Sequence, residues 1–241
     1  TSLWACDKTH HSRIKRDKDA LLSCIGDSLT EKQTNAVRQK INADHKAELI
    51  QAFFNKKHRA GFNGSVLVAQ NGVVLFDKQY GYAHLRQKDT LTAAHTFQLA
   101  SLSKPFTALA VLQLAEDNKL SLEDSVQKFF PKFPYRGVTV KSLLSHRSGL
   151  PNYMYTFPDS VSRGQKYPSN QTVMNWFEEL KPVANNRPER GFSYNNSNYL
   201  VLGAIIEKVS KLTFEEYMKR NLFEPLEMHN TFLATSTDST F

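Results

Sequence analysis

The sequence predicts a mixed α/β (α+β) fold, in which one antiparallel hairpin is followed by a series of helices. Two β-rich runs flank Asn71-Gly72, a dipeptide that accepts the positive φ angles of a tight hairpin turn. Apolar residues recur at helical spacing ahead of this hairpin, up to about Gly61, and again at several places after residue 104. A lone hairpin is marginally stable, so further strands of the sheet are expected to lie beyond Phe241; a hairpin that packs on helices alone is the alternative.

The helical segments differ in strength. Residues 104–118 are apolar around most of the helix circumference, which predicts a buried helix. Thr213-Phe-Glu-Glu216 is a capping box that starts another helix, expected to reach about Leu222. Residues 152–170 are rich in Pro, Ser, Asn and Tyr and are predicted to form a long loop. Shorter helices are expected at residues 138–146, 171–180 and 197–210.

The chain divides into two parts by composition. Residues 1–45 are polar and charged, with few aromatic residues, and are interpreted as a leader or linker. Residues 46–241 carry the apolar patterns and are interpreted as one partial domain.

Charge and cysteine content exclude several classes of protein. The formal net charge of +8 lies mostly in residues 1–60 and is not interleaved with aromatic residues, so nucleic acid is not an expected partner. The two cysteines and eight histidines show no zinc-binding spacing. The longest apolar run, residues 200–206, is too short to cross a bilayer.

Cys6 has a distinctive neighbourhood. Leu3-Trp4-Ala5-Cys6 resembles a bacterial lipoprotein box, and the polar run after it could tether a lipidated cysteine to a folded domain. A possible lipid anchor through Cys6 would place the protein in the bacterial cell envelope or periplasm. A disulfide between Cys6 and Cys24, or two free thiols, are the alternatives.

The pattern Ser-x-x-Lys occurs three times, so the spacing alone decides nothing. Ser12–Lys15 lies in the charged leader, and Ser125–Lys128 lies on a surface-like turn. A lysine becomes a useful base only where burial or a nearby cation lowers its pKa. Both of these pairs are therefore interpreted as structural.

Ser101–Lys104 differs because it starts the predicted buried helix. A spacing of three places both side chains on one face of that helix. The helix start offers unpaired N–H groups to a developing oxyanion, and Pro105 is tolerated in the first turn. The alternative is that Ser101 only caps the helix.

A second motif lies immediately ahead of another apolar helix. Tyr194 and Asn196 form the one Tyr-x-Asn of the chain. A tyrosine hydroxyl near a lysine ammonium can relay a proton, and an asparagine amide can bind both a lysine and a substrate carbonyl.

Three blocks in this order resemble the serine β-lactamase and penicillin-binding-protein superfamily, in particular its branch of class C β-lactamases, D-Ala-D-Ala carboxypeptidases and esterases. The blocks are ASLSKPFTALAVLQLAEDNKLSLEDSV, VTVKSLLSHRSGLPNY and FSYNNSNYLVLGAIIEKVSKLTFEEYMKRNLFEPLEM. The resemblance extends from about Phe62 to Phe241. It implies a β-lactamase/transpeptidase-like fold, with an antiparallel sheet flanked by helices and a mostly helical region.

The resemblance also implies roles for the matched residues. Ser101 would be the nucleophile, Lys104 its activator, Tyr194 the general base and later acid, and Asn196 a residue that positions substrate and lysine. The enzyme would be a serine hydrolase that passes through an acyl-enzyme and needs no metal or organic cofactor. The block that starts at His146 resembles a structural turn of the family, and no catalytic role is expected for it.

One family element is missing. No Lys-[Thr/Ser]-Gly and no His-x-Gly occurs in the chain, although the family carries one beside the nucleophile, on a strand that supplies an oxyanion-hole amide. The chain is therefore expected to be a fragment without its C-terminal strands, inactive or weakly active as it stands. A naturally degenerate form is the alternative, as is an inactive binding or scaffold protein of the cell envelope.

The expected partner is a small-molecule or peptide acyl substrate. β-Lactams, D-amino-acid peptides and esters all fit an acyl-serine mechanism, and the sequence does not choose among them. It also does not set the oligomeric state.

Overall fold

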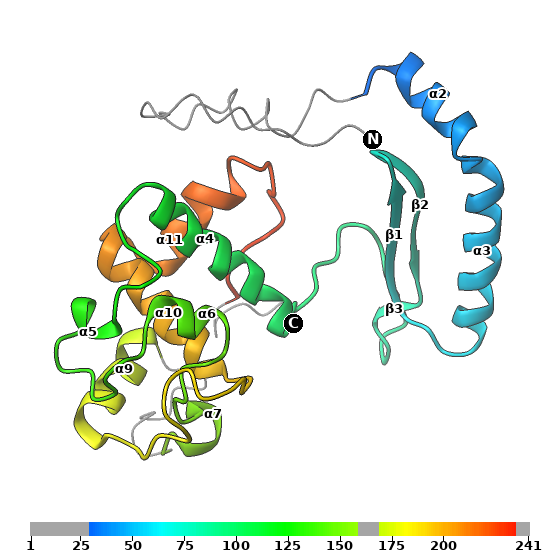
Figure 1. The fold of residues 1–241 in the computed structure, drawn as a ribbon. Helices are drawn as coiled ribbons and strands as arrows, with labels where there is room; N and C mark the ends of the chain where they lie inside the picture. The colour runs from blue at the N-terminus through cyan, green and yellow to red at the C-terminus, as the bar shows by residue number, and fades with distance from the viewer. Residues whose placement is uncertain (1–28, 159–168, 235–241) are drawn as a thin grey trace. The chain divides into compact units, whose positions relative to one another are not determined.

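The computed structural model describes residues 29–158 and 169–234. The chain forms two compact units, residues 1–97 and residues 98–241 (Figure 1). The early residues with Cys6, Cys24 and the Ser12–Lys15 pair lie outside the described residues. The domain boundary expected near residue 45 stays a prediction.

In residues 29–97 the first unit contains two helices and two antiparallel strand pairs. Its elements are α2 (Glu31–Lys40), α3 (Ala43–Arg59), β1 (Gly64–Gln70), β2 (Val73–Tyr80), β3 (Tyr82–His84) and β4 (Asp89–Thr90). α3 runs alongside the β1–β2 hairpin (Figure 1). The ring of Phe54 on α3 stacks on Phe76 and Tyr80 of β2, at centroid distances of 6.0 and 6.3 Å.

The hairpin confirms the expectation from Asn71-Gly72. Both residues have positive φ, 53° and 77°, as the two-residue turn requires. Register shifts once, between Val68 and Ala69, where the ladder contains a bulge or irregularity. Within the part of the chain that the structure describes, β1–β2 has no third strand, and β3–β4 forms a separate two-stranded sheet that the sequence did not predict.

The second unit is helical and is built around α10. Its elements are a 3₁₀ turn η1 (Ala100–Ser103), α4 (Lys104–Glu116), α5 (Val126–Phe129), α6 (Val140–Leu144), α7 (Tyr153–Thr156), α9 (Asn170–Leu180), α10 (Asn196–Ser210), α11 (Phe214–Met218) and a π-helical turn η2 (Lys219–Phe223). α10 contacts α4, α6, α9 and α11. Val201, Leu202, Ile205 and Ile206 of α10 are fully buried, which makes this helix the centre of the core.

Most expected helices are present, with differences at particular places. The helix at 104 ends at Glu116, and its Leu109 and Leu112 are exposed rather than buried. The capping box at Thr213 is confirmed, but the α-helix that it starts ends at Met218 and continues as the π-turn. The predicted loop after Pro151 contains the short helix α7, whose residue Asn152 accepts a bond from the Met154 N–H as an N-cap.

Candidate active site

Ser101 lies in the 3₁₀ turn η1, directly before Lys104, the first residue of α4. The sequence predicted that Ser101 would start the α-helix. In the structure Ser101 lies one turn ahead of that helix. Ala100 has a left-handed φ of 46°, a conformation that is uncommon for a residue with a side chain. Lys104 Nζ donates to Ser101 Oγ over 3.1 Å, so the spacing of three does place the two groups together.

Tyr194 and Asn196 reach the same point from the start of α10. Tyr194 Oη lies 2.6 Å from Ser101 Oγ, and Asn196 Oδ1 accepts a hydrogen bond of 2.8 Å from Lys104 Nζ. The structure thus brings together all four residues that the resemblance selected, from segments more than 90 positions apart. All four belong to the second unit.

The electrostatics of the site lower the pKa of Tyr194. Hydrogen bonding to Lys104, and next to Ser101, holds the pKa of the Tyr194 hydroxyl below its ordinary value. The Lys104 ammonium also lies 4.9 Å from the centroid of the Tyr194 ring. A phenolate beside a serine hydroxyl can accept its proton, and the ammonium can stabilise the resulting charges.

Met154 is a site residue that the sequence analysis missed. Asn196 Nδ2 contacts its sulfur atom, and 60% of the methionine is exposed. It belongs to α7, in the stretch that was predicted as an irregular loop. No sequence signal pointed to it, because its position depends on how a four-residue helix lies against α10.

The Ser125–Lys128 pair lies in a different setting. Lys128 Nζ binds Asp124 Oδ2 over 2.7 Å, and Ser125 precedes α5 without a side-chain capping bond. Neither residue contacts a tyrosine hydroxyl or an asparagine amide in the bonds found among described residues. The Ser12–Lys15 pair lies outside the described residues.

Buried polar side chains fix the start of α10 beneath the site. Asn195 is the N-cap, and its Oδ1 accepts from the Ser197 N–H over 2.9 Å. Its Nδ2 donates to the Leu150 carbonyl, and Ser197 Oγ donates to the Pro151 carbonyl over 2.7 Å. The sequence analysis missed this role, although an Asn-Asn-Ser run ahead of an apolar helix is a recognisable cap signal.

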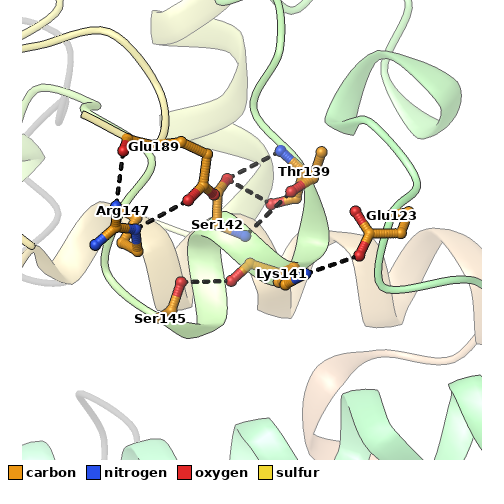
Figure 2. A network of polar contacts seen from close by, with 7 residues as sticks. All are labelled: Glu123, Thr139, Lys141, Ser142, Ser145, Arg147 and Glu189. Carbon is orange, nitrogen blue, oxygen red and sulfur yellow. Dashed lines mark hydrogen bonds and ion pairs between the residues drawn. The ribbon is translucent and has the colours of Figure 1, made fainter. Parts of the chain in front are cut away.

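Arg147 holds the loop that leads to Tyr194. Its Nε donates to Glu189 Oε2 over 2.9 Å, and a terminal nitrogen donates to the Glu189 carbonyl over 2.7 Å (Figure 2). The helix ahead of it, α6, starts with a capping box between Thr139 and Ser142 (Figure 2). This cap fixes the position from which Arg147 extends.

A serine whose hydroxyl contacts both a lysine and a tyrosine is typical of enzymes that transfer acyl groups through a covalent serine intermediate. Residues 47–239 match the family model described as Beta-lactamase. The chain belongs to this family, and the resemblance to the serine β-lactamase and penicillin-binding-protein superfamily is confirmed.

Relatives and solved structures agree with this assignment. The chain is 38% identical over 190 residues to "Penicillin-binding protein 4*" of Bacillus subtilis (strain 168), covering 78% of this chain and 42% of that protein. The structure of FmtA from Staphylococcus aureus matches with a TM-score of 0.67 and 28% identity, over 78% of this chain and 50% of that one. A D-amino acid amidase from Ochrobactrum anthropi matches with a TM-score of 0.61 and 26% identity, over 73% and 51%.

These findings set the fold and the general chemistry. The fold is of the β-lactamase/transpeptidase type, and the family and its neighbours are serine hydrolases that act by acyl transfer. The chain spans about two fifths of the length of the curated relatives it matches.

A membrane-spanning helix and a cluster of metal-ligating side chains are both absent from residues 29–158 and 169–234. No helix there is both long and apolar enough to cross a membrane. In the same residues, no group of three or more His, Cys, Asp or Glu side chains is placed to hold a metal ion.

Proposed function

We propose that this chain carries the acyl-enzyme site of a serine hydrolase of the penicillin-binding-protein type, with Ser101 as the nucleophile. One observation carries the proposal: Ser101 Oγ lies within hydrogen-bond distance of both Lys104 Nζ, at 3.1 Å, and Tyr194 Oη, at 2.6 Å. A serine that only capped a helix would need neither neighbour.

In the first half of the reaction, Ser101 Oγ attacks the substrate carbonyl while its proton passes to the Tyr194 phenolate. The new bond joins Oγ to the carbonyl carbon, and the carbon–nitrogen or carbon–oxygen bond of the substrate breaks. The proton held by Tyr194 then passes to the leaving amine or alcohol. In the second half, water attacks the acyl carbon and gives a proton to Tyr194. The bond between the acyl carbon and Ser101 Oγ then breaks, Oγ takes the proton back from Tyr194, and the acid is released.

Lys104 and Asn196 support both halves. The ammonium stabilises the tyrosine phenolate and the developing charge on Oγ. Asn196 Oδ1 keeps the ammonium in place at 2.8 Å, and its Nδ2 faces the exposed side of the site, where a substrate carbonyl could replace the contact with Met154.

The relatives support the substrate classes that we propose. β-Lactams, D-amino-acid peptides or amides, and small esters all present a carbonyl with a leaving group, and the matched proteins include a penicillin-binding protein and a D-amino acid amidase.

We further propose that the protein acts in the bacterial cell envelope, with Cys6 as a lipid attachment point.

A second function is favoured by one specific observation. Residues 1–241 contain no Lys-[Thr/Ser]-Gly and no His-x-Gly, the motif that the family is expected to carry on the strand beside the nucleophile. Loss of one oxyanion donor costs about 10²–10³ in rate. A binding or scaffold protein without turnover is the corresponding alternative.

Intact mass spectrometry of the full-length gene product separates the two. The protein is exposed to a β-lactam and, separately, to a fluorophosphonate, beside a Ser101→Ala variant. An adduct on the parent and none on the variant is expected, and the reagent that reacts narrows the substrate class. A folded parent that forms no adduct with either reagent contradicts the hydrolase and supports the binding protein.

A further inference from the structure

The mechanism above makes no use of His146, a buried and ionisable side chain directly beneath the site. It follows α6, has a left-handed φ of 56°, and is only 8% exposed. Its ring lies 4.6 Å from that of Tyr194 and 5.1 Å from that of Tyr199, centroid to centroid.

The hydrogen bonds at Nδ1 settle its protonation state. Nδ1 lies 3.1 Å from the backbone nitrogen of Asn195, which can only donate. It also lies 3.0 Å from Asn198 Nδ2. An imidazole nitrogen that accepts a hydrogen bond carries no proton, so the ring is neutral with its proton on Nε2.

The Asn198 amide has a second partner, Ser148, on its other side. The Leu150 N–H donates to Ser148 Oγ over 3.2 Å, and the Ser148 hydroxyl donates in turn to Asn198 Oδ1. Because Oδ1 accepts from Ser148, the NH₂ group of Asn198 is the part that faces His146. The chain of donors starts at one backbone N–H and ends at Nδ1, and both asparagines and Ser148 are almost fully buried.

The surroundings oppose a positive charge on this ring. Burial lowers the pKa of His146, and repulsion by the nearby Lys104 ammonium lowers it further. Tyr194 and Tyr199 are the other titratable groups packed on the ring. Protonation at Nδ1 would also break both hydrogen bonds that it accepts.

His146 binds the backbone on both sides of Tyr194, through its carbonyl and through its ring. The His146 carbonyl accepts from the Ser193 N–H over 2.8 Å, while Nδ1 accepts from the Asn195 N–H. The residues on both sides of Tyr194 are therefore bound to one residue, and Tyr194 lies against its ring. Arg147 adds the bonds to Glu189 further along the loop (Figure 2).

We propose that His146 is a positioning residue, a neutral acceptor that fixes the backbone on both sides of Tyr194 and so sets the contact between Tyr194 and Ser101. Among the described residues its hydrogen bonds go to backbone and amide groups, none to Ser101, Lys104 or the Tyr194 hydroxyl, and it acts through Tyr194. The inference rests on the proposed function, because it assigns a purpose to the position of Tyr194. A displacement of about 1 Å in a reacting group can cost about 100-fold in rate.

A matched pair of variants isolates the acceptor. His146→Asn keeps an acceptor close to the position of Nδ1, and His146→Gly removes it. Both residues tolerate the left-handed φ of this position, and both lack the ring. Fluorophosphonate labelling of the full-length protein gives the maximal rate and the half-saturating concentration separately.

We expect His146→Asn to retain the labelling rate to within about tenfold and His146→Gly to lose about 100-fold, with the half-saturating concentration little changed in both. Equal rates for the two variants, high or low, would overturn the proposal. Val126→Ala, in the core at the far helix α5, serves as a control for lost stability and should keep the parent rate.

Nuclear magnetic resonance gives a test that does not depend on turnover. The ¹⁵N signals of His146, assigned by their loss in His146→Asn, should show the neutral Nε2–H form around pH 7, and an Nδ1–H form would overturn the proposal. The pKa of Tyr194, measured by titration of its ¹³Cζ signal, should be unchanged in His146→Asn. In His146→Gly it should shift towards the ordinary value for tyrosine. If the fluorophosphonate forms no adduct with the parent but the NMR signals are as expected, the serine hydrolase proposal is contradicted and the positioning role of His146 is not.

Discussion

The chain contains the same four-residue pattern in two described places, and the two have different surroundings. At Ser101–Lys104, the lysine contacts the serine, the amide of Asn196 and the ring of Tyr194. At Ser125–Lys128, the lysine contacts the carboxylate of Asp124 instead. The comparison shows that the spacing only places serine and lysine near each other, and that a third and fourth residue from distant segments decide whether the serine can be activated.

Removal of the lysine should separate the two pairs most strongly. Lys104→Ala deprives Ser101 of its ammonium neighbour and should lower the rate of labelling by about 10²–10⁴, the range of general acid–base contributions. Lys128→Ala removes only an exposed ion pair and should leave the rate unchanged. The labelling rate of the two variants, measured side by side with intact mass, provides the check, and a similar loss in both would remove the distinction.

Tyr194→Phe should have the next largest effect, about 100-fold. The ring and its contacts stay, but the oxygen that lies 2.6 Å from Ser101 Oγ is lost. Because the bond to Lys104, and then that to Ser101, lowers the pKa of Tyr194, the parent rate should rise with pH and level off below about 10, the ordinary value for tyrosine. A rate–pH profile that is the same in parent and variant would exclude Tyr194 as the base.

Gly149→Ala tests whether the turn beneath the site needs its backbone conformation. Gly149 has a φ of 71°, and an added Cβ would lie 2.2 Å from the Asn186 carbonyl oxygen. The free energy of unfolding should fall by about 1–3 kcal/mol. Gly191→Ala is the matched control, because its Cβ would meet nothing within 4 Å and its φ is not left-handed. If Gly149→Ala and Gly191→Ala had equal midpoints of urea unfolding, the expected backbone strain at residue 149 would be contradicted.

The smallest effect concerns the structural pair. Burial raises the pKa of Asp124, but the hydrogen bonds from Lys128 and the Ser121 N–H outweigh it and hold that pKa below its ordinary value. A lowered carboxyl pKa stabilises the fold above about pH 4 and ceases to do so as the pH falls. Asp124→Asn should therefore lose about 1 kcal/mol or less at pH 7 and less at pH 3. Urea unfolding at both pH values measures the loss in the free energy of unfolding. A larger loss at pH 3 than at pH 7 would contradict a lowered pKa of Asp124.

Local patterns in the sequence predicted the parts of the fold that depend on neighbours in the chain. Asn71-Gly72 predicted the hairpin because its turn requires only those two residues, and the apolar run at Leu200 predicted α10. The short helix α7 was missed because it is stabilised from outside: the Tyr153 N–H donates to Ser197 Oγ, 44 positions away.

The candidate site was only partly accessible to such reasoning. Spacing alone could not choose among the Ser-x-x-Lys pairs, and the family resemblance was needed to join Ser101 to Tyr194. His146 was identified as part of a turn, but its bonds to Asn195 and Asn198 lie about 50 positions along the chain. No local pattern specifies contacts between segments so far apart.

The most direct test of the central claim is to map the fluorophosphonate adduct on the full-length parent protein by peptide sequencing. Both serines of the comparison are then measured in one molecule under one condition. The account predicts that the adduct lies on Ser101 and that Ser125 remains unmodified. An adduct on Ser125, or a folded protein in which Ser101 stays unmodified, would contradict it.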